Sequence, residues 1–493
     1  MARLVSISRA AKLVGVSRGN LQRRIQDGEL ESFEGQVRLS DLSQVFPNVS
    51  LEDNSMLEKL ERIIEHAAIT TRNRTRTLPP DMEQLAARVN LLTEDLVEAK
   101  LEISIFYNIV DKLKARLNTL SRAHPQLTDD VRNLQAWFLE EIEQISEKKL
   151  EQFSLVATDT FLRLVAAQVH IEPSGHEFFV EGSNSILESG LSAGLALNYG
   201  CSNGNCGKCK AKLLAGEIKK IRPHDYALSE KDKLQGYFLA CSNTAVTDII
   251  IAADEADSEN DIPLQAIQAR VRKLDYPKPD LCVLNVQTPR TQRLRFLAGQ
   301  KVKLEIPGVG AHSVHVASCP CDDMHVQFHI TNDDSVPFIK HLFTEIKPND
   351  VINIEGPTGH FVLHEDETNP IIFIAFADGF PPIKSLVEHA MTLNVTEHID
   401  LYWAVADEND LYMHNNCRAW SDAFERFAYL PVIRSSPERT LSDEVINSIQ
   451  VNHPQLDSYH FYLAGPAREV AATQEALQRR GIKPECIFSE TLA

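Results

Sequence analysis

The feature of this sequence that most restricts its fold is a group of three cysteines within nine residues. The stretch CSNGNCGKC has the spacing Cys201-x4-Cys206-x2-Cys209, and a fourth cysteine, Cys241, follows in FLACSN. Thiolates are soft metal ligands, and clustered cysteines in a reducing compartment indicate metal ligation before disulfides. Glycines within the stretch let its backbone bend tightly around a bound group. The pattern therefore predicts a metal centre.

The spacing separates two kinds of centre. Structural zinc sites usually take CxxC pairs. A C-x4-C-x2-C run followed by a distant cysteine is instead typical of the plant-type [2Fe–2S] cluster. We predict one [2Fe–2S] cluster, with a zinc site as the alternative. Its predicted ligands are Cys201, Cys206, Cys209 and Cys241.

Longer segments around these cysteines resemble ferredoxin modules that are fused to flavoprotein reductases. The similar segments are residues 185–218 and 226–253. The resemblance implies a β-grasp ferredoxin domain over 168–256.

The rest of the chain, about 265–493, resembles ferredoxin-NADP reductase-like proteins, such as oxygenase reductase components and CDP-6-deoxy-glucoseen reductase. The motifs that carry the resemblance are FLAGQKVKLEIPG (296–308), EGPTGHFVL (355–363) and IIFIAFADGFPPIKSLVEHAM (371–391). The resemblance implies a flavin-binding-like antiparallel β-barrel over 264–366. It also implies a C-terminal NAD(P)-binding-like α/β domain over 367–493.

The chemical positions of that family are altered here. The family's flavin motif is Arg-x-Tyr-Ser, and the matching stretch HSVHVASCP has His312, Val314 and His315 in its place. Arginine is a bidentate phosphate partner, and tyrosine offers a stacking surface for the flavin ring. The Gly-Gly-Thr-Gly loop keeps only Gly379, and Cys-Gly-Pro reads Ala464-Gly465-Pro466.

We therefore expect FAD and NAD(P)H turnover to be lost or altered, and we assign no catalytic residue. The alternative is that the same cofactors bind through other contacts. The candidate cofactor contacts are His312, Val314, His315, Ser318, Gly379, Gly465 and Pro466.

The N-terminal segment carries a different signal. Ile7, Ala10, Ala11 and Val14 fall on one face of a first helix, Gly15 makes a turn, and Ser17 caps a second helix. This stretch resembles the winged helix-turn-helix of MerR-type regulators and excisionases, which implies such a domain over 1–50. A small helical domain for protein contact is the alternative.

A local basic patch supports DNA binding, although the net charge of the whole chain is −19. Six basic residues precede the first acidic residue, Asp27. Residues at the start of a recognition helix reach base edges, and neighbouring arginines hold phosphates. The candidate DNA contacts are Arg18, Asn20, Arg23 and Arg24.

The region 51–167 is predicted to be a helical coiled coil that dimerises the chain. From Met82 to Leu120, apolar residues recur in steps of three and four over more than five heptads. A second helical stretch, about 128–167, leaves pairing within the chain and pairing between chains both open. A spacer without a regulatory role is the alternative.

Three functions follow from this organisation. The favoured one is a redox-responsive DNA-binding dimer whose reductase module has lost or altered its turnover. The alternative is an NAD(P)H-dependent reductase component that passes electrons to an oxygenase or similar redox partner, and a coiled-coil scaffold is the weaker option. We expect a cytoplasmic protein without a membrane span. We interpret Cys319 and Cys321 as two incidental cysteines rather than a redox pair.

Overall fold

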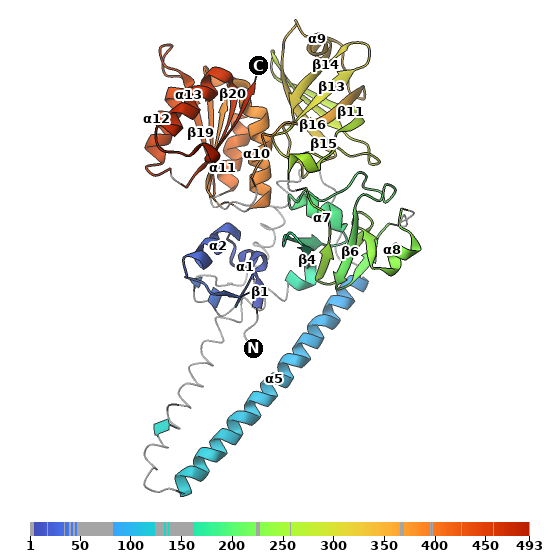
Figure 1. Cartoon of the computed structure of the whole chain (residues 1–493), viewed down its shortest axis with the longest axis vertical. Helices are drawn as coiled ribbons and strands as arrows, with labels where there is room; N and C mark the ends of the chain where they lie inside the picture. The colour runs from blue at the N-terminus through green and yellow to red at the C-terminus, as the bar shows by residue number, and fades with distance from the viewer. Residues whose placement is uncertain are drawn as a thin grey trace.

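The computed structural model describes most of the chain (Figure 1). The described residues are 4–16, 18–33, 35–38, 41–42, 45–46, 82–123, 133–134, 137, 162–222, 227–256, 258–364, 369–394, 396, 398–424, 426–456 and 458–492. Among them, no helix is both long enough and apolar enough to cross a membrane.

The N-terminal unit has two short helices beside a three-stranded antiparallel sheet of order β1-β3-β2. Its elements are β1 (Leu4–Ser6), α1 (Ile7–Val14), α2 (Arg18–Gln26), β2 (Ser32–Phe33) and β3 (Gln36–Arg38). Ser6 caps α1, and Gly15 ends it in the left-handed conformation at φ 73°. The predicted Ser17 cap lies outside the described residues, and the winged helix-turn-helix assignment stays a prediction.

Helix α5 (Met82–Ala123) is one continuous helix of 42 residues. Its first turns are bound to the domain that follows: the Gln84 side chain is buried, and Arg88 donates to three backbone carbonyls. Further along, Leu96, Ile103 and Phe106 are each more than half exposed. Coiled-coil pairing stays a prediction, and the second helical stretch lies largely outside the described residues.

The cysteine loop belongs to a domain built on a five-stranded mixed sheet of order β5-β4-β10-β6-β8. The strands are β4 (Ala166–Glu172), β5 (Glu177–Glu181), β6 (Lys210–Ala215), β8 (Tyr237–Leu239) and β10 (Ile249–Ala252). The other elements are α7 (Ile186–Ser192), α8 (Glu230–Leu234), β7 (Ile218–Lys220) and β9 (Asn243–Ala245). Alternate residues of β4 and β5 point into an apolar core, as a half-buried sheet requires.

The next domain is a six-stranded antiparallel sheet of order β14-β13-β16-β11-β12-β15, which agrees with the expected barrel. Its strands are β11 (Gln265–Lys278), β12 (Leu281–Gln287), β13 (Lys301–Ile306), β14 (Gly310–His315), β15 (His325–Thr331) and β16 (Val351–Thr358). Helix α9 (Pro337–Thr344) packs on its core.

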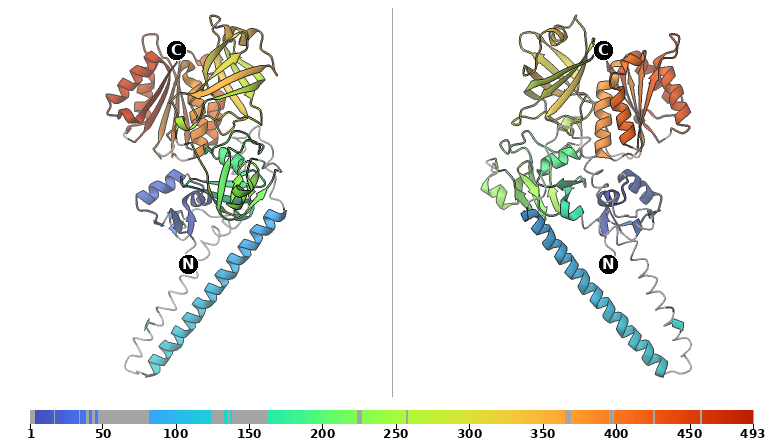
Figure 2. Two further views of the ribbon diagram at one scale, coloured as in Figure 1. Left: turned by 45° about the vertical axis from the view of Figure 1, so that its right-hand side comes forward. Right: turned by 180° about the vertical axis from the view of Figure 1, so that it is seen from behind.

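The C-terminal domain is a parallel five-stranded sheet of order β19-β18-β17-β20-β21, with helices on both faces (Figure 2). Its strands are β17 (Ile371–Phe376), β18 (Ile399–Val405), β19 (Phe427–Ile433), β20 (His460–Pro466) and β21 (Ile487–Leu492). Its helices are α10 (Phe380–Leu393), α11 (His414–Ala423), α12 (Leu441–Asn452) and α13 (Ala467–Gln478). Every residue of β17 is buried, as is typical of a central parallel strand.

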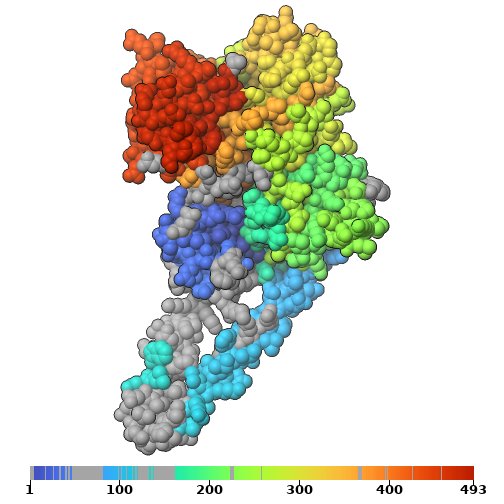
Figure 3. Space-filling view, in the orientation of Figure 1, coloured from blue at the N-terminus to red at the C-terminus, as the bar shows by residue number. Residues whose placement is uncertain are grey.

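The N-terminal unit packs against the cysteine-bearing domain through α1 (Figure 3). The Arg9 guanidinium lies 3.3 Å from an Asp248 carboxylate oxygen, and the Lys12 ammonium lies 3.4 Å from Glu181. Two of the six basic residues that suggested a DNA-binding patch are therefore used inside the molecule.

Candidate functional site

The four predicted cluster cysteines are linked by two contacts, one between Cys209 and Cys241 and one between Cys201 and Cys206. The Sγ atoms of Cys209 and Cys241 lie 3.3 Å apart, and the backbone N–H of Cys206 donates to Cys201 Sγ at 3.4 Å. A two-iron cluster distributes four thiolates as two on each iron, and this arrangement matches that need. Among the described side chains, no three or more His, Cys, Asp or Glu surround a single metal position. The individual ligand assignments stay predictions.

The electrostatics of the loop favour thiolates at two of these positions. The hydrogen bond with Cys209 lowers the pKa of Cys241 to about 6, and the same bond raises the pKa of Cys209. Burial alone would raise the pKa of Cys201, but backbone N–H groups led by that of Asn203 outweigh it and lower the pKa. The donor set is therefore suited to a soft cation, because the thiolate is the ligating form.

Arg222 braces this loop, and no sequence motif indicated it. Its guanidinium donates to the carbonyl of Cys241 at 2.9 Å, to the carbonyl of Ser202, and to the Glu188 carboxylate at 2.9 Å. The positive φ values of Gly204 (86°) and Gly207 (76°) are those that the loop was expected to need from glycine.

The cysteine loop is also bonded to the barrel. Ser202 N–H donates to the carbonyl of Arg290 at 3.1 Å, and Arg293 N–H donates to the carbonyl of Gly200 at 3.0 Å. The buried Arg293 guanidinium donates to Ser202 Oγ at 3.0 Å and lies 3.6 Å from Asp323. These bonds place the predicted cluster at the junction with the barrel.

The positions expected to contact a flavin lie on β14, and their side chains are already engaged. The His312 ring stacks on Phe338, and burial lowers its pKa, which disfavours the charged form that could hold a phosphate. Val314 is buried in the barrel core. Ser318 Oγ accepts a bond from the Gln327 N–H at 3.1 Å. These residues do not fit the arginine and tyrosine contacts of the family's motif.

His315 belongs to an ion-pair group that joins the barrel to the last strand of the C-terminal domain. Its Nε2 lies 3.0 Å from Glu490 Oε1, and Lys301 Nζ donates to the same oxygen at 3.1 Å. Glu490 is half-buried, and sequence reasoning had no signal for it. The hydrogen bond from His315, aided by Lys301, holds the pKa of Glu490 below its usual value.

The lowered pKa of Glu490 predicts an acid-sensitive interface. A depressed carboxyl pKa contributes stability above the unfolded value of 4.5, and the contribution is lost as pH falls through the folded pKa. We therefore expect the free energy of unfolding of wild type, measured in urea, to fall relative to that of Glu490→Gln as the pH drops below 4.5. Glu485→Gln, at an exposed side chain, is the control and should follow wild type. Parallel pH profiles for wild type and Glu490→Gln would contradict the prediction.

The candidate nucleotide loop is packed directly onto the end of β20. A Cβ at Gly379 would lie 2.0 Å from the carbonyl oxygen of Ala464, and one at Gly465 would lie 2.6 Å from Phe376 Cβ. The two glycines are therefore required by this close approach, and Pro466 ends the strand. The N-terminus of α10 follows at the carboxyl edge of the parallel sheet, where such folds bind nucleotides.

The DNA candidates on α2 are less available than expected. Arg24 Nε donates to Asn20 Oδ1 at 3.1 Å, and Arg24 also pairs with Glu29 at 2.9 Å. Its guanidinium lies over the Phe46 ring as well. Arg23 is exposed and Arg18 half-buried. DNA contact by these residues stays a prediction.

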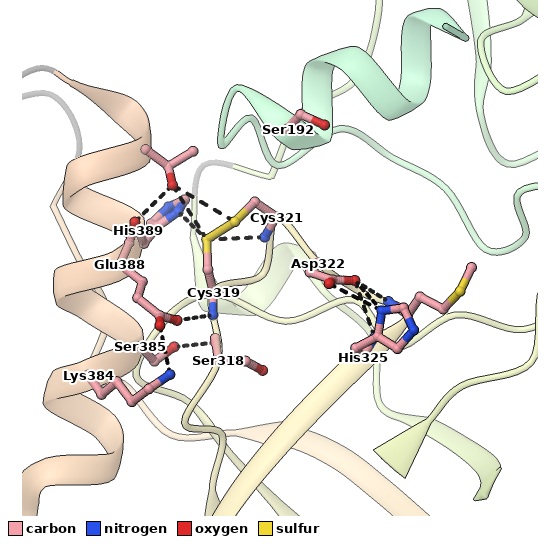
Figure 4. Close-up of a disulfide and its surroundings, with 12 residues drawn as sticks. Ser192, Ser318, Cys319, Cys321, Asp322, His325, Lys384, Ser385, Glu388 and His389 are labelled. Carbon is pink, nitrogen blue, oxygen red and sulfur yellow. Dashed lines mark hydrogen bonds and ion pairs between the residues drawn. A yellow bond between two sulfur atoms is a disulfide. The ribbon is translucent and has the colours of Figure 1, made fainter. Parts of the chain in front are cut away.

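Cys319 and Cys321 are not incidental, and that interpretation was wrong. The two form a disulfide directly after the altered flavin motif (Figure 4). The CxC spacing was the feature of the sequence that could have indicated this disulfide. No other described cysteine belongs to a disulfide.

Comparison with protein families finds two matches. The model described as "2Fe-2S iron-sulfur cluster binding domain" matches residues 169–246, and the model described as "Oxidoreductase NAD-binding domain" matches residues 373–475. The chain thus combines a ferredoxin-type domain, which supports a [2Fe–2S] cluster, with an NAD-binding oxidoreductase domain.

Curated relatives cover the same two-thirds of the chain. CDP-6-deoxy-L-threo-D-glycero-4-hexulose-3-dehydrase reductase of Yersinia pseudotuberculosis serotype I (strain IP32953) is 26% identical over 66% of this chain and 98% of its own length. Terephthalate 1,2-dioxygenase, reductase component 1, of Comamonas sp is 25% identical over 66% of this chain and 97% of its own. The crystal structure of an Amycolatopsis cytochrome P450 reductase matches with a TM-score of 0.42 and 23% identity, over 66% of this chain and 98% of that one.

Proposed function

We propose that this chain is an NAD(P)H-dependent reductase component that passes electrons from its [2Fe–2S] cluster to a separate redox protein, such as an oxygenase component. The observation that carries the proposal is the bonding of the cysteine loop to the barrel through Arg293 and Ser202. It holds the cluster loop against the reductase module, where electrons are supplied. Relatives named as reductases or reductase components, aligned over nearly their whole lengths, support the same function.

The exposed part of the loop indicates where electrons leave. Asn205, Cys206 and Lys208 are exposed, whereas Cys201 and Cys209 are buried. A bound cluster adds and releases single electrons, and its ligand at 206 lies at the surface. We place partner docking at this exposed part of the loop, because the bonds of Ser202 to Arg293 and Arg290 hold the preceding residues to the barrel.

The expected loss of FAD and NAD(P)H chemistry finds no support in the comparisons. The residues at β14 do not form the family's usual flavin contacts, so we assign no step to a flavin. We propose instead that the cofactors bind through other contacts, the alternative named above. The DNA-binding dimer receives no support from the comparisons, and it stays the competing hypothesis.

An absorbance spectrum and an anaerobic titration of the full-length protein test this function. We expect one FAD for each [2Fe–2S] cluster, and NADH or NADPH should bleach flavin and cluster alike. Arg293→Gln should slow reduction of the cluster by NADH or NADPH and leave its reduction by dithionite unchanged. Arg290→Gln is the matched control, because among the described residues Arg290 meets the loop through its backbone carbonyl. A cluster that dithionite reduces but both nucleotides leave oxidised, in protein without flavin, would contradict the proposal.

A further inference from the structure

The Cys319–Cys321 disulfide lies where three domains meet. The two cysteines belong to the barrel, and α10 of the C-terminal domain packs beside them (Figure 4). The cluster-bearing domain approaches from the other side, since a Cβ built on Gly194 would lie 3.4 Å from His389 Cε1. His389 on α10 therefore meets both the disulfide and the cluster-bearing domain.

Helix α10 holds the backbone that precedes the disulfide. Cys319 N–H donates to Glu388 Oε2 at 3.1 Å. Lys384 Nζ donates to Glu388 Oε1 and to the carbonyl of Ala317, each at 2.7 Å. Ser385 Oγ donates to the carbonyl of Ser318 at 2.7 Å. These bonds hold the backbone of Cys319 against α10, so its sulfur lies next to side chains of that helix.

The neighbours of the two sulfurs differ. His389 Nδ1 lies 3.8 Å from Cys319 Sγ, and the Cys321 N–H donates to the same sulfur at 3.3 Å. Thr392 Oγ1 lies 3.9 Å from each sulfur. Cys319 Sγ thus lies beside an imidazole and a backbone N–H that can stabilise a thiolate, which suits it as a leaving group in thiol exchange.

Cys321 instead lines a small cavity at the domain junction. The cavity is about 20 Å³, which is room for a single water. Tyr199 of the cluster-bearing domain, Arg295 of the barrel and His389 line it too. Cys321 is therefore the sulfur that faces the junction between the domains.

This disulfide has little to stabilise. The stabilisation that a disulfide gives to a fold grows with the length of chain it closes, and this one joins residues two positions apart. The barrel strands on either side are already held by their sheet. A structural role would thus add almost nothing, whereas a chemical role uses the close spacing and the groups around Cys319.

We propose that Cys319 and Cys321 are a redox-active pair that is reduced by a dithiol, with His389 positioning the leaving sulfur. A thiolate of the reductant attacks Cys321 Sγ, forms a mixed disulfide and breaks the S–S bond. Cys319 leaves as a thiolate beside His389 and takes up a proton that the dithiol has released. The second thiol of the reductant then attacks its own sulfur in the mixed disulfide and releases Cys321, so two electrons and two protons reduce the pair.

The test uses the full-length protein under anaerobic conditions and does not depend on NAD(P)H, flavin or a partner. The protein is equilibrated with mixtures of reduced and oxidised dithiothreitol, quenched with acid and alkylated in denaturant. Mass spectrometry of the peptide that contains both cysteines then gives the reduced fraction. We expect one reversible transition in the folded protein, with both thiols appearing together.

Variants separate chemistry from structure. His389→Gln should shift the dithiol ratio at half-reduction by about tenfold, and the control His341→Gln, on α9, should leave it unchanged. Cys319→Ser, which leaves Cys321, should form a mixed disulfide with glutathione disulfide faster than Cys321→Ser does. Two outcomes would overturn the proposal. One is two free thiols in protein that is alkylated without reductant, and the other is a disulfide that dithiothreitol reduces only after unfolding.

Discussion

Replacing Cys241 with alanine is expected to remove the iron–sulfur cluster. Each iron of a [2Fe–2S] cluster needs two thiolates, and Cys241 is the predicted ligand that lies far along the chain from the loop. Its loss leaves Cys209, whose sulfur lies 3.3 Å away, without its partner. Iron and acid-labile sulfide per chain should fall to less than about one-tenth of wild type, and visible absorbance should fall with them. Chemical iron analysis measures the effect.

Cys417→Ala is the matched control, because Cys417 is also fully buried but lies on α11 of the C-terminal domain. It should keep its full iron content. Circular dichroism of both variants establishes that the fold is retained. A Cys241→Ala protein with full iron content would show that another residue completes the cluster, and our ligand set would be wrong.

Replacing Arg88 with leucine is expected to be the most destabilising change on α5. The buried guanidinium donates to the carbonyls of Val246, Leu164 and Ala245, at 2.8, 2.9 and 3.3 Å. A buried polar group without its partner costs about 1–3 kcal/mol, so the loss of these bonds should lower the free energy of unfolding by about 3 kcal/mol or more. Urea denaturation, followed by helical circular dichroism and by loss of cluster absorbance, measures it.

Arg116→Leu on the same helix is the control, because Arg116 is exposed. It should change the free energy of unfolding by no more than about 0.5 kcal/mol. Equal effects of the two substitutions would mean that Arg88 does not anchor the helix.

The sequence predicted those parts of the molecule that depend on local spacing. The cysteine loop, its positive-φ glycines and the turn at Gly15 follow from short stretches, and the order of the barrel and α/β domain follows from resemblance. The heptads of α5 marked an apolar face but could not identify what covers it.

The remaining features depend on contacts between distant residues. Arg9 was counted in a DNA-binding patch, but it pairs with Asp248, 239 positions further along the chain. Arg293 reaches Ser202 across 91 positions. No pattern in either local stretch encodes such a partner, because the partner is chosen by the packing of whole domains. The same holds for Glu490, which is part of a strand of ordinary composition.

Helix α5 is bonded to the cysteine-bearing domain at one end, and its length determines how far the other end moves when its direction changes. A helix of 42 residues is about 63 Å long at a rise of about 1.5 Å per residue, and the bonds of Gln84 and Arg88 hold its first turns. Arg88 binds the carbonyls of residues 245 and 246, four and five positions after Cys241. Over this length, a change of about 5° in the direction of the helix would move its far end by about 5 Å. The length of the helix therefore converts a small change of its direction at the domain into a large displacement of its far end.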